Sequence, residues 1–224
     1  MNDTFERLQE AEHKAAELFL EMERRQIIAP GVSEKQINTA VFELAEELFN
    51  IKKYWHKRIV RAGVNTLQPY DENPPNLIVQ EDDIVFLDFG PILEEYEADY
   101  GRTYVLGNDR TKHRLADDSE RLWFMAQEYL LKDPSLTGNE LYSYCMQIAQ
   151  DAGWEFGGPI AGHLIGHFPH EQLEGEDKTN YIHPENKIAM NSLDSEGKAR
   201  HWIIEIHLVD REKKIGSFFE QVAI

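Results

Sequence analysis

The stretch from Ile84 to Val105 reads IVFLDFGPILEEYEADYGRTYV and contains two apolar, strand-like runs separated by a break. The first run ends at Asp88, and the second begins near Asp99. Gly and Pro at 90–91 end the first run and polar residues follow, so the simplest prediction is a β-hairpin. A four-residue loop at 92–95 would place Asp88 directly opposite Asp99.

Two opposed carboxylates in an apolar hairpin need a physical reason. Residues opposite each other in an antiparallel pair share a face and lie about 5 Å apart at Cβ, where two like charges repel. A metal cation between Asp88 and Asp99 would remove this repulsion. The alternative is that both aspartates are solvated at a strand end, or that Arg102 pairs with one of them.

A second hairpin near the C-terminus gives the same arrangement. Trp202 to Val209 has a strand pattern, a charged turn follows, and 215–224 (IGSFFEQVAI) returns as a strand. A four-residue loop at 211–214 would place Glu205 opposite Glu220, although a slip of one residue would break the pairing. We therefore expect four carboxylates from two hairpins to form one site.

The remaining pattern predicts mainly helices around these hairpins. The expected elements are a helix from Asn2 or Asp3 to about Gln26, a helix after Ser33 to about Phe49, a strand from Tyr54 to Ala62, a loop over 63–76, a helix from Thr111 to about Lys132, and a helix from Thr137 to about Asp151. In the strand, His56 and Arg58 either face a cleft or lie on a solvated face.

A histidine cluster precedes the second hairpin in the segment GGPIAGHLIGHFPHE, residues 157–171. His163 and His167 have the i, i+4 spacing of a helical zinc pair. The neighbouring Gly162, Gly166 and Pro169 discourage a helix, so an extended segment that presents histidine to a site is expected.

Composition limits the classes of function. The formal net charge of −18 argues against nucleic acid and against an anionic membrane surface as partners. The single cysteine, Cys145, excludes an internal disulfide and suits a reducing compartment, so a cytoplasmic protein is expected. The charged N-terminus predicts no signal peptide, and no apolar run approaches the about 18 residues of a membrane span.

Four carboxylates and a histidine form a ligand set of mostly hard oxygen donors. Such a set suits two transition-metal ions about 3.5–4 Å apart, which lower the pKa of a water and polarise a carbonyl. This is hydrolase chemistry.

These residues resemble the pita-bread metallopeptidases, which include the methionine aminopeptidases, aminopeptidase P, prolidase and the creatinase relatives. The resemblance rests on LDFGP followed by ADYGRTYV, on GHLIGHFPHE, on IIEI and on FFEQ, and runs from about Phe5 to Ile224. It implies an α/β (α+β) pita-bread fold with two pseudo-twofold halves and an antiparallel sheet. We expect a single catalytic domain over 1–224, with the helices of about 3–49 as scaffold.

The resemblance also implies a role for each matching residue. The five metal ligands would be Asp88, Asp99, His163, Glu205 and Glu220. Asp88 would hold one ion, Asp99 and Glu220 would bridge both, and His163 and Glu205 would hold the other. Glu205 would also be the general base, and His170 would donate a hydrogen bond to the scissile carbonyl or stabilise the tetrahedral oxyanion. The cofactors would be two divalent ions of Mn, Co, Fe or Zn.

The chain departs from the family pattern at four places. Tyr70 follows Pro69 where a histidine is usual, and His56 is a candidate to replace it. Leu164 stands where a glycine is usual, and Ile206 where a proline follows the glutamate. Phe218-Phe219 stands where an arginine often precedes the last ligand.

The leading hypothesis is a dinuclear metallopeptidase that removes an N-terminal residue from a short peptide, of the Xaa-Pro aminopeptidase or dipeptidase type. A creatinase-like hydrolase is a weaker alternative. The alternative from another class is a non-catalytic module that binds a peptide or partner in the same cleft. A homodimer is expected from analogy with relatives alone.

Overall fold

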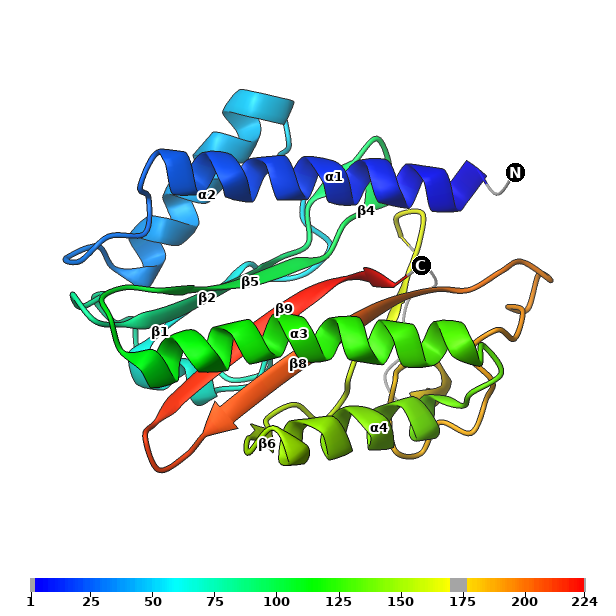
Figure 1. The fold of residues 1–224 in the computed structure, drawn as a ribbon. Coiled ribbons are helices and arrows are strands. Elements are labelled where there is room, and N and C mark those ends of the chain that lie inside the picture. Colours follow the sequence, from blue (N-terminus) through cyan, green and yellow to red (C-terminus); the bar gives the residue numbers. More distant parts are fainter. Residues whose placement is uncertain (1–2, 170–176, 224) are drawn as a thin grey trace.

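The computed structural model describes residues 3–169 and 177–223 and is built on an antiparallel sheet (Figure 1). Its strands are β1 (Ile59–Ala62), β2 (Ile84–Phe89), β5 (Tyr100–Val105), β6 (Glu155–Phe156), β7 (Leu164–Ile165), β8 (His201–Asp210) and β9 (Ile215–Ala223). The order across the sheet is β1-β2-β5-β9-β8-β6, and β7 also pairs with β8. The C-terminal strand β9 therefore lies in the middle of the sheet.

Four helices accompany the sheet: α1 (Asp3–Arg24), α2 (Glu34–Phe49), α3 (Arg110–Lys132) and α4 (Gly138–Asp151). Ser33 and Thr137 begin α2 and α4 with capping boxes: each side chain accepts a hydrogen bond from the backbone N–H of residue N3, and the N3 side chain accepts one from the backbone N–H of the cap residue. Asp109 caps α3 through the backbone N–H groups of Thr111 and Lys112. All four predicted helices are present.

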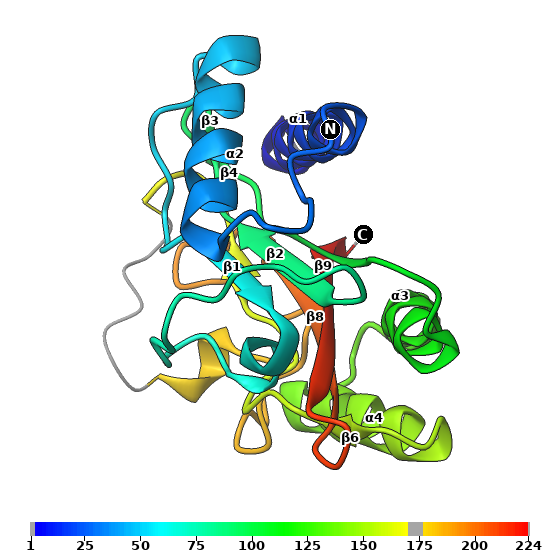
Figure 2. The ribbon, with the colours of Figure 1, turned by 90° about the vertical axis from the view of Figure 1, so that its left-hand side faces the viewer.

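The helices bury one face of the sheet in two cores. In the first core, α1 and α2 pack on alternate residues of β2, Val85, Leu87 and Phe89. In the second, α3 and α4 pack on alternate residues of β8, including Ile204 and Ile206. Figure 2 shows these helices around one side of the twisted sheet, while the long loops lie on the other. Residues that alternate with these core positions therefore face away from the helices.

The predicted register of the second hairpin is confirmed, whereas that of the first is wrong by two residues. Asp210 pairs with Ile215 and Glu205 pairs with Glu220, as predicted. In the first hairpin, however, Asp88 pairs with Gly101 rather than with Asp99.

A tighter turn causes the shift. Beyond β2 the chain forms a small hairpin, β3 (Ile92–Leu93) and β4 (Tyr96–Glu97), closed by Glu94 and Glu95 alone. Both glutamates have positive φ, 46° and 72°, as a two-residue type I′ turn requires. Asparagine and glycine are the usual signals of this turn, and their absence made a longer loop the simpler prediction.

The predicted strand from Tyr54 to Ala62 is shorter in the structure, since β1 begins only at Ile59. Tyr54 instead forms an isolated bridge with Pro91. The predicted loop after β1 begins with a 3₁₀ helix, η1 (Gly63–Leu67).

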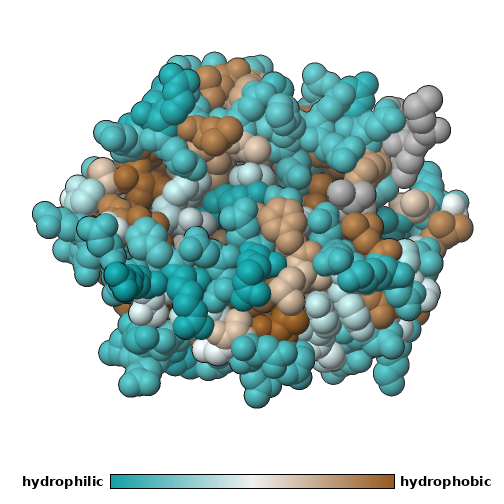
Figure 3. Space-filling view, in the orientation of Figure 1, coloured by the Kyte–Doolittle hydropathy of each residue, from teal (hydrophilic) through white to brown (hydrophobic). Residues whose placement is uncertain are grey.

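The surface is predominantly hydrophilic on the face that carries α1 and α3, where hydrophobic side chains form small separate patches (Figure 3). Across residues 3–169 and 177–223, none of the helices has the length and apolar content needed to span a membrane.

Candidate metal centre

One row of paired residues crosses four neighbouring strands and carries three of the predicted ligands. Asp88 on β2 pairs with Gly101 on β5, Gly101 pairs with Glu220 on β9, and Glu220 pairs with Glu205 on β8. Residues paired in this way share one face of the sheet, which here is the face opposite the helices. The two hairpins thus meet at Gly101, and their carboxylates form one cluster.

Asp99 belongs to the same cluster despite the corrected register. A shift of two residues preserves the side on which a residue points, so Asp99 becomes a diagonal neighbour of Asp88 instead of its direct partner. Asp99 lies between β4 and β5 and is 2 % exposed. The predicted approach of the two aspartates to one site is therefore retained, although their direct pairing is not.

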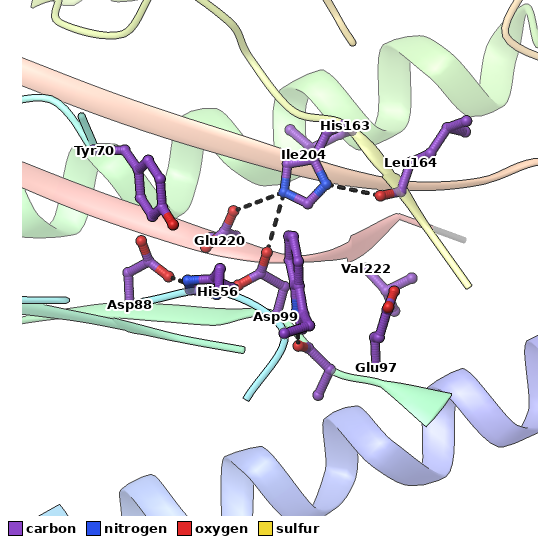
Figure 4. Close-up of polar contacts among 12 residues, drawn as sticks. His56, Tyr70, Asp88, Glu97, Asp99, His163, Leu164, Ile204, Glu220 and Val222 are labelled. Carbon is purple, nitrogen blue, oxygen red and sulfur yellow. Dashed lines mark hydrogen bonds and ion pairs between the residues drawn. The ribbon is translucent and has the colours of Figure 1, made fainter. Parts of the chain in front are cut away.

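His163 reaches this cluster from the segment that precedes β7. Its Nε2 lies 3.1 Å from Asp99 Oδ2 and 3.8 Å from Glu220 Oε1 (Figure 4). The Nδ1–H donates to the carbonyl of Leu164 at 2.8 Å, which leaves Nε2 facing the carboxylates.

Gly162 allows the His163 segment to lie close against β8. Its φ is +139°, and a Cβ at this position would lie 2.0 Å from the carbonyl oxygen of Ile203. The backbone N–H of Ile203 in turn donates to the carbonyl of His163 at 2.8 Å. A larger residue at 162 would push the histidine away from the carboxylates.

His56 also reaches the cluster. Of the two alternatives for this residue, it therefore faces the cavity and does not lie on a solvated face. Its Nε2 lies 3.1 Å from Asp99 Oδ1 and 3.5 Å from Asp88 Oδ1. Figure 4 shows His56 between these two aspartates. Arg58 points elsewhere, since its guanidinium donates to Asn38 and stacks on Phe42.

Arg102 and His167 do not take part in the cluster. Arg102 does not pair with either aspartate in this structure; it donates to the carbonyls of Gly101 and Glu220 between the rings of Tyr100 and Phe219. His167 is largely exposed near Glu95, and its segment is extended rather than helical, as predicted, with β7 at Leu164–Ile165. His170 lies outside the described residues.

The cluster forms one wall of a cavity of about 470 Å³. Its other lining residues are mostly aromatic or from loops and include Trp55, Ile59, Pro69, Tyr70, Phe86, Pro159, Ile160, Lys178, Tyr181, His207 and Phe218. Tyr70, at the position where the family usually has histidine, is 46 % exposed and carries the ammonium of Lys57 over its ring.

The apolar part of this cavity was missed by the sequence analysis. His207 and Phe218 lie two residues from Glu205 and Glu220, and the alternation of a strand places them on the same face. With Phe86 they form an aromatic group whose ring centroids are 5.3–6.0 Å apart. Burial lowers the pKa of His207 to about 4, and its Nε2–H donates to the carbonyl of Thr66. Alternation around the predicted ligands was the signal that would have found them.

Electrostatics in the cluster favour a bound cation. Burial raises the pKa of Asp88 to about 7, even though His56 opposes this effect, and burial likewise raises the pKa of Glu205 to about 7. The pKa of Glu220 is raised well above its usual value by burial and by the charges of Asp99 and Asp88. Burial would also raise the pKa of Asp99, but the neighbouring His56 and His163 outweigh it and hold that pKa below its usual range.

The donor atoms present fit divalent metal ions. Two groups of three side chains converge, His56 with Asp88 and Asp99, and Asp99 with His163 and Glu220. Asp88 Oδ1 and Glu220 Oε2 are buried and have no hydrogen-bond partner among the described residues. A buried carboxylate oxygen without a donor is costly, and a cation would satisfy it.

Comparisons with known proteins agree with this site. The sequence model of metallopeptidase family M24 matches residues 6–193, and the chain belongs to this family. The match ends before β8 and β9. The support for Glu205 and Glu220 as site residues is therefore the pairing of these strands within the sheet.

Two curated relatives are Xaa-Pro dipeptidases. That of Lactobacillus delbrueckii subsp. lactis is 33 % identical over 114 residues, which cover 50 % of this chain and 30 % of the relative. That of Lactobacillus helveticus is 29 % identical over 156 residues, or 67 % of this chain and 41 % of the relative. The chain thus spans less than half the length of these relatives.

Solved structures show the same pita-bread fold. An X-Pro aminopeptidase from Thermotoga maritima has a TM-score of 0.73 at 24 % identity. The superposition covers 97 % of this chain and 56 % of the aminopeptidase. A methionine aminopeptidase from the same organism has a TM-score of 0.68 at 17 % identity, and the whole chain covers 90 % of it. The predicted α/β pita-bread fold is confirmed.

Proposed function

We propose that this chain is a dinuclear metal-dependent peptidase that removes the N-terminal residue of short peptides, of the Xaa-Pro aminopeptidase or dipeptidase type. The observation that carries the proposal is the convergence of four carboxylates and two imidazoles on one wall of a cavity, in a chain of family M24. The names of the two curated relatives support the Xaa-Pro preference.

Five residues are proposed as the ligands of two divalent ions. Asp88 would hold one ion, Asp99 and Glu220 both, and His163 and Glu205 the other. The oxygen-rich donor set suits Mn, Co, Fe or Zn. Ions held there would polarise the scissile carbonyl and lower the pKa of the attacking water.

Glu205 is proposed as the general base. Its carboxyl lines the cavity opposite Glu220, where it could accept a proton from the attacking water and return it to the leaving amine. The role proposed for His170, stabilisation of the oxyanion, concerns a residue outside the described part of the chain.

The aromatic end of the cavity would receive the apolar part of the substrate. Phe86, Phe218 and Ile59 pack together in one buried cluster beside the carboxylates. His207 keeps its ring fixed by donating to Thr66. A proline ring or another uncharged side chain would bury its apolar surface there, whereas a charged side chain would lose its hydration.

Hydrolysis assays test the proposal directly. Protein loaded in turn with Mn, Co, Fe and Zn would be incubated with a panel of dipeptides and tripeptides with and without proline at the second position. We expect release of the first residue, fastest from Xaa-Pro substrates, and loss of turnover in Glu205→Gln. An absence of hydrolysis over the whole panel with bound metal would favour the alternative, a binding module without activity. Complete retention of the predicted ligands does not favour that alternative.

We also propose a cytoplasmic location, supported by a single cysteine that is buried and unpaired. Homodimerisation stays a prediction from analogy.

A further inference from the structure

We propose that His56 is a sixth protein ligand of the metal centre and supplies a nitrogen donor to the ion that Asp88 and Asp99 hold. The inference rests on the proposed function, since it requires metal at this site. It would give each of the two ions one imidazole, from His56 and His163.

The strongest support is that His56 and His163 are held in the same way. Each Nδ1–H donates at 2.8 Å to the carbonyl of the next residue, Lys57 for His56 and Leu164 for His163. This bond fixes the tautomer that leaves Nε2 available for a metal. The two Nε2 atoms then approach opposite oxygens of one carboxylate, Oδ1 and Oδ2 of Asp99, both at 3.1 Å.

The surrounding residues shape a space for the His56 ring. Gly90, directly after β2, lies so close that a Cβ there would be 2.2 Å from His56 Cδ2 and 2.3 Å from Nε2. On another side, the Trp55 ring lies at 4.4 Å from the His56 ring and 5.2 Å from the His163 ring, between centroids. Trp55 is fixed in turn, because its Nε1–H donates to the carbonyl of Ala98.

The buried oxygen that lacks a partner lies where His56 points. Asp88 Oδ1 has no hydrogen-bond partner among the described residues, yet it lies 3.5 Å from His56 Nε2. Two donor atoms at that separation can bind the same ion, because metal–nitrogen and metal–oxygen bonds of about 2.0–2.2 Å span it. The side chain of His56 is 7 % exposed, so its Nε2 is directed at the carboxylates more than at solvent.

A nitrogen donor at both ions would change the metal preference of the site. Imidazole suits Zn, Cu, Fe and Ni, whereas carboxylate and water oxygens suit Mg, Ca and Mn. We therefore expect this chain to bind Zn²⁺ at both positions in preference to Mn²⁺, and His56→Gln to weaken that preference at one position.

The test is proton NMR of the full chain loaded with Co²⁺ and labelled with ¹⁵N-histidine. A ligating imidazole whose Nδ1–H is hydrogen bonded gives a strongly shifted, exchangeable N–H signal. We expect two such signals at saturation in the unaltered protein, and one after His56→Gln. Titration with Co²⁺ should show that the variant binds one of its two ions at least about 100-fold more weakly, since loss of a ligand should cost no less than loss of a group that only supports one.

His167→Gln is the matched control, because its imidazole is exposed and lies outside the cluster. It should keep both signals and both affinities. A single shifted signal in the unaltered protein, or two signals that persist in His56→Gln, would overturn the proposal while leaving the metallopeptidase assignment intact. A failure to bind any cobalt would overturn the metal centre itself together with this inference. His56→Asn, which keeps a hydrogen-bond donor, provides a second variant if the glutamine side chain does not fit.

Discussion

Asp88 and Glu220 both lie opposite Gly101, one on each side of it across the sheet. The absence of a side chain at this position lets the Phe218 ring and the Glu220 side chain pack directly over the backbone of Gly101. The arrangement of the carboxylates thus depends on a position without a side chain in this row.

Filling that position should damage the site. In Gly101→Ala the new Cβ would lie 2.6 Å from the Phe218 ring and 3.0 Å from the Cβ of Glu220. Because both neighbours are buried, we expect a loss of about 1–3 kcal/mol in the free energy of unfolding and weaker metal binding. Urea unfolding and metal titration would measure both. Gly197→Ala has open space around its new Cβ but a φ of +79°, so it can lose stability through backbone strain while its metal binding stays intact. Equal losses of metal affinity in the two variants would contradict this explanation.

Metal removal should destabilise the fold. Four carboxylates repel in the cation-free cluster, so we expect chelation to lower the melting temperature by about 5–10 °C and added divalent ions to restore it. Thermal melts with and without chelator, with metal content measured in parallel, would test this. An identical melting curve after complete metal removal would show that no preformed site exists.

Asp99 should be the most sensitive single ligand, because it contacts both histidines. Protein purified without added metal should hold about two ions per chain, as a two-metal hydrolase site does, and Asp99→Ala should lose most of this content. Asp82→Ala removes an exposed carboxylate as a control. A variant at Asp99 that keeps two ions would contradict the bridging role.

The aromatic end of the cavity should control substrate binding. In Phe218→Ala we expect KM for Xaa-Pro peptides to rise by about 10-fold with a smaller change in kcat, since an aromatic contact contributes about 1–1.5 kcal/mol. Steady-state kinetics with an apolar and a charged second residue would separate apolar contact from general damage. An equal effect on both substrates would argue against this pocket.

The stability of the fold should depend on pH through the ionisation of Glu12 on α1. Burial raises its pKa from 4.5 to about 7, although the N–H of Val222 and the charge of Arg102 oppose the rise. The folded state therefore holds this proton more tightly than the unfolded state does. Its contribution to stability is complete below pH 4.5 and is lost as the pH rises through 7.

Glu12→Gln should remove this dependence. At pH 8 the variant should be more stable than the parent by about 1–2 kcal/mol, because it avoids ionising a buried carboxyl, and the difference should shrink at pH 5. Urea unfolding at both pH values would show this. Glu6→Gln, at an exposed position of the same helix, should change little at either pH. A larger gain in the free energy of unfolding at pH 5 than at pH 8 would contradict the raised pKa of Glu12.

The two hairpins show how far the sequence could predict this site. Glu205 and Glu220 could be paired because a charged four-residue turn separates two long apolar strands. The first hairpin could not, because Glu94 and Glu95 adopt a tight turn that their residue types do not indicate. The predicted register of the first hairpin was wrong by two residues. Because this number is even, Asp88 and Asp99 still point to the same face of the sheet.

The position of His56 depended on tertiary contacts. It precedes β1 in an irregular segment, so strand alternation did not apply to it. Its place beside Asp99 follows from the space over Gly90 and from the wall made by Trp55, and neither is a local property of the chain.

The order of the strands couples closure of the sheet to assembly of the site. The strand β9 follows β8 in the sequence, yet it lies between β5 and β8 and carries Glu220. Until β9 pairs with both neighbours, β5 and β8 each expose an unpaired edge, and the carboxylates of the two hairpins are not joined. Protection of these two edges and assembly of the carboxylate cluster are therefore the same folding step.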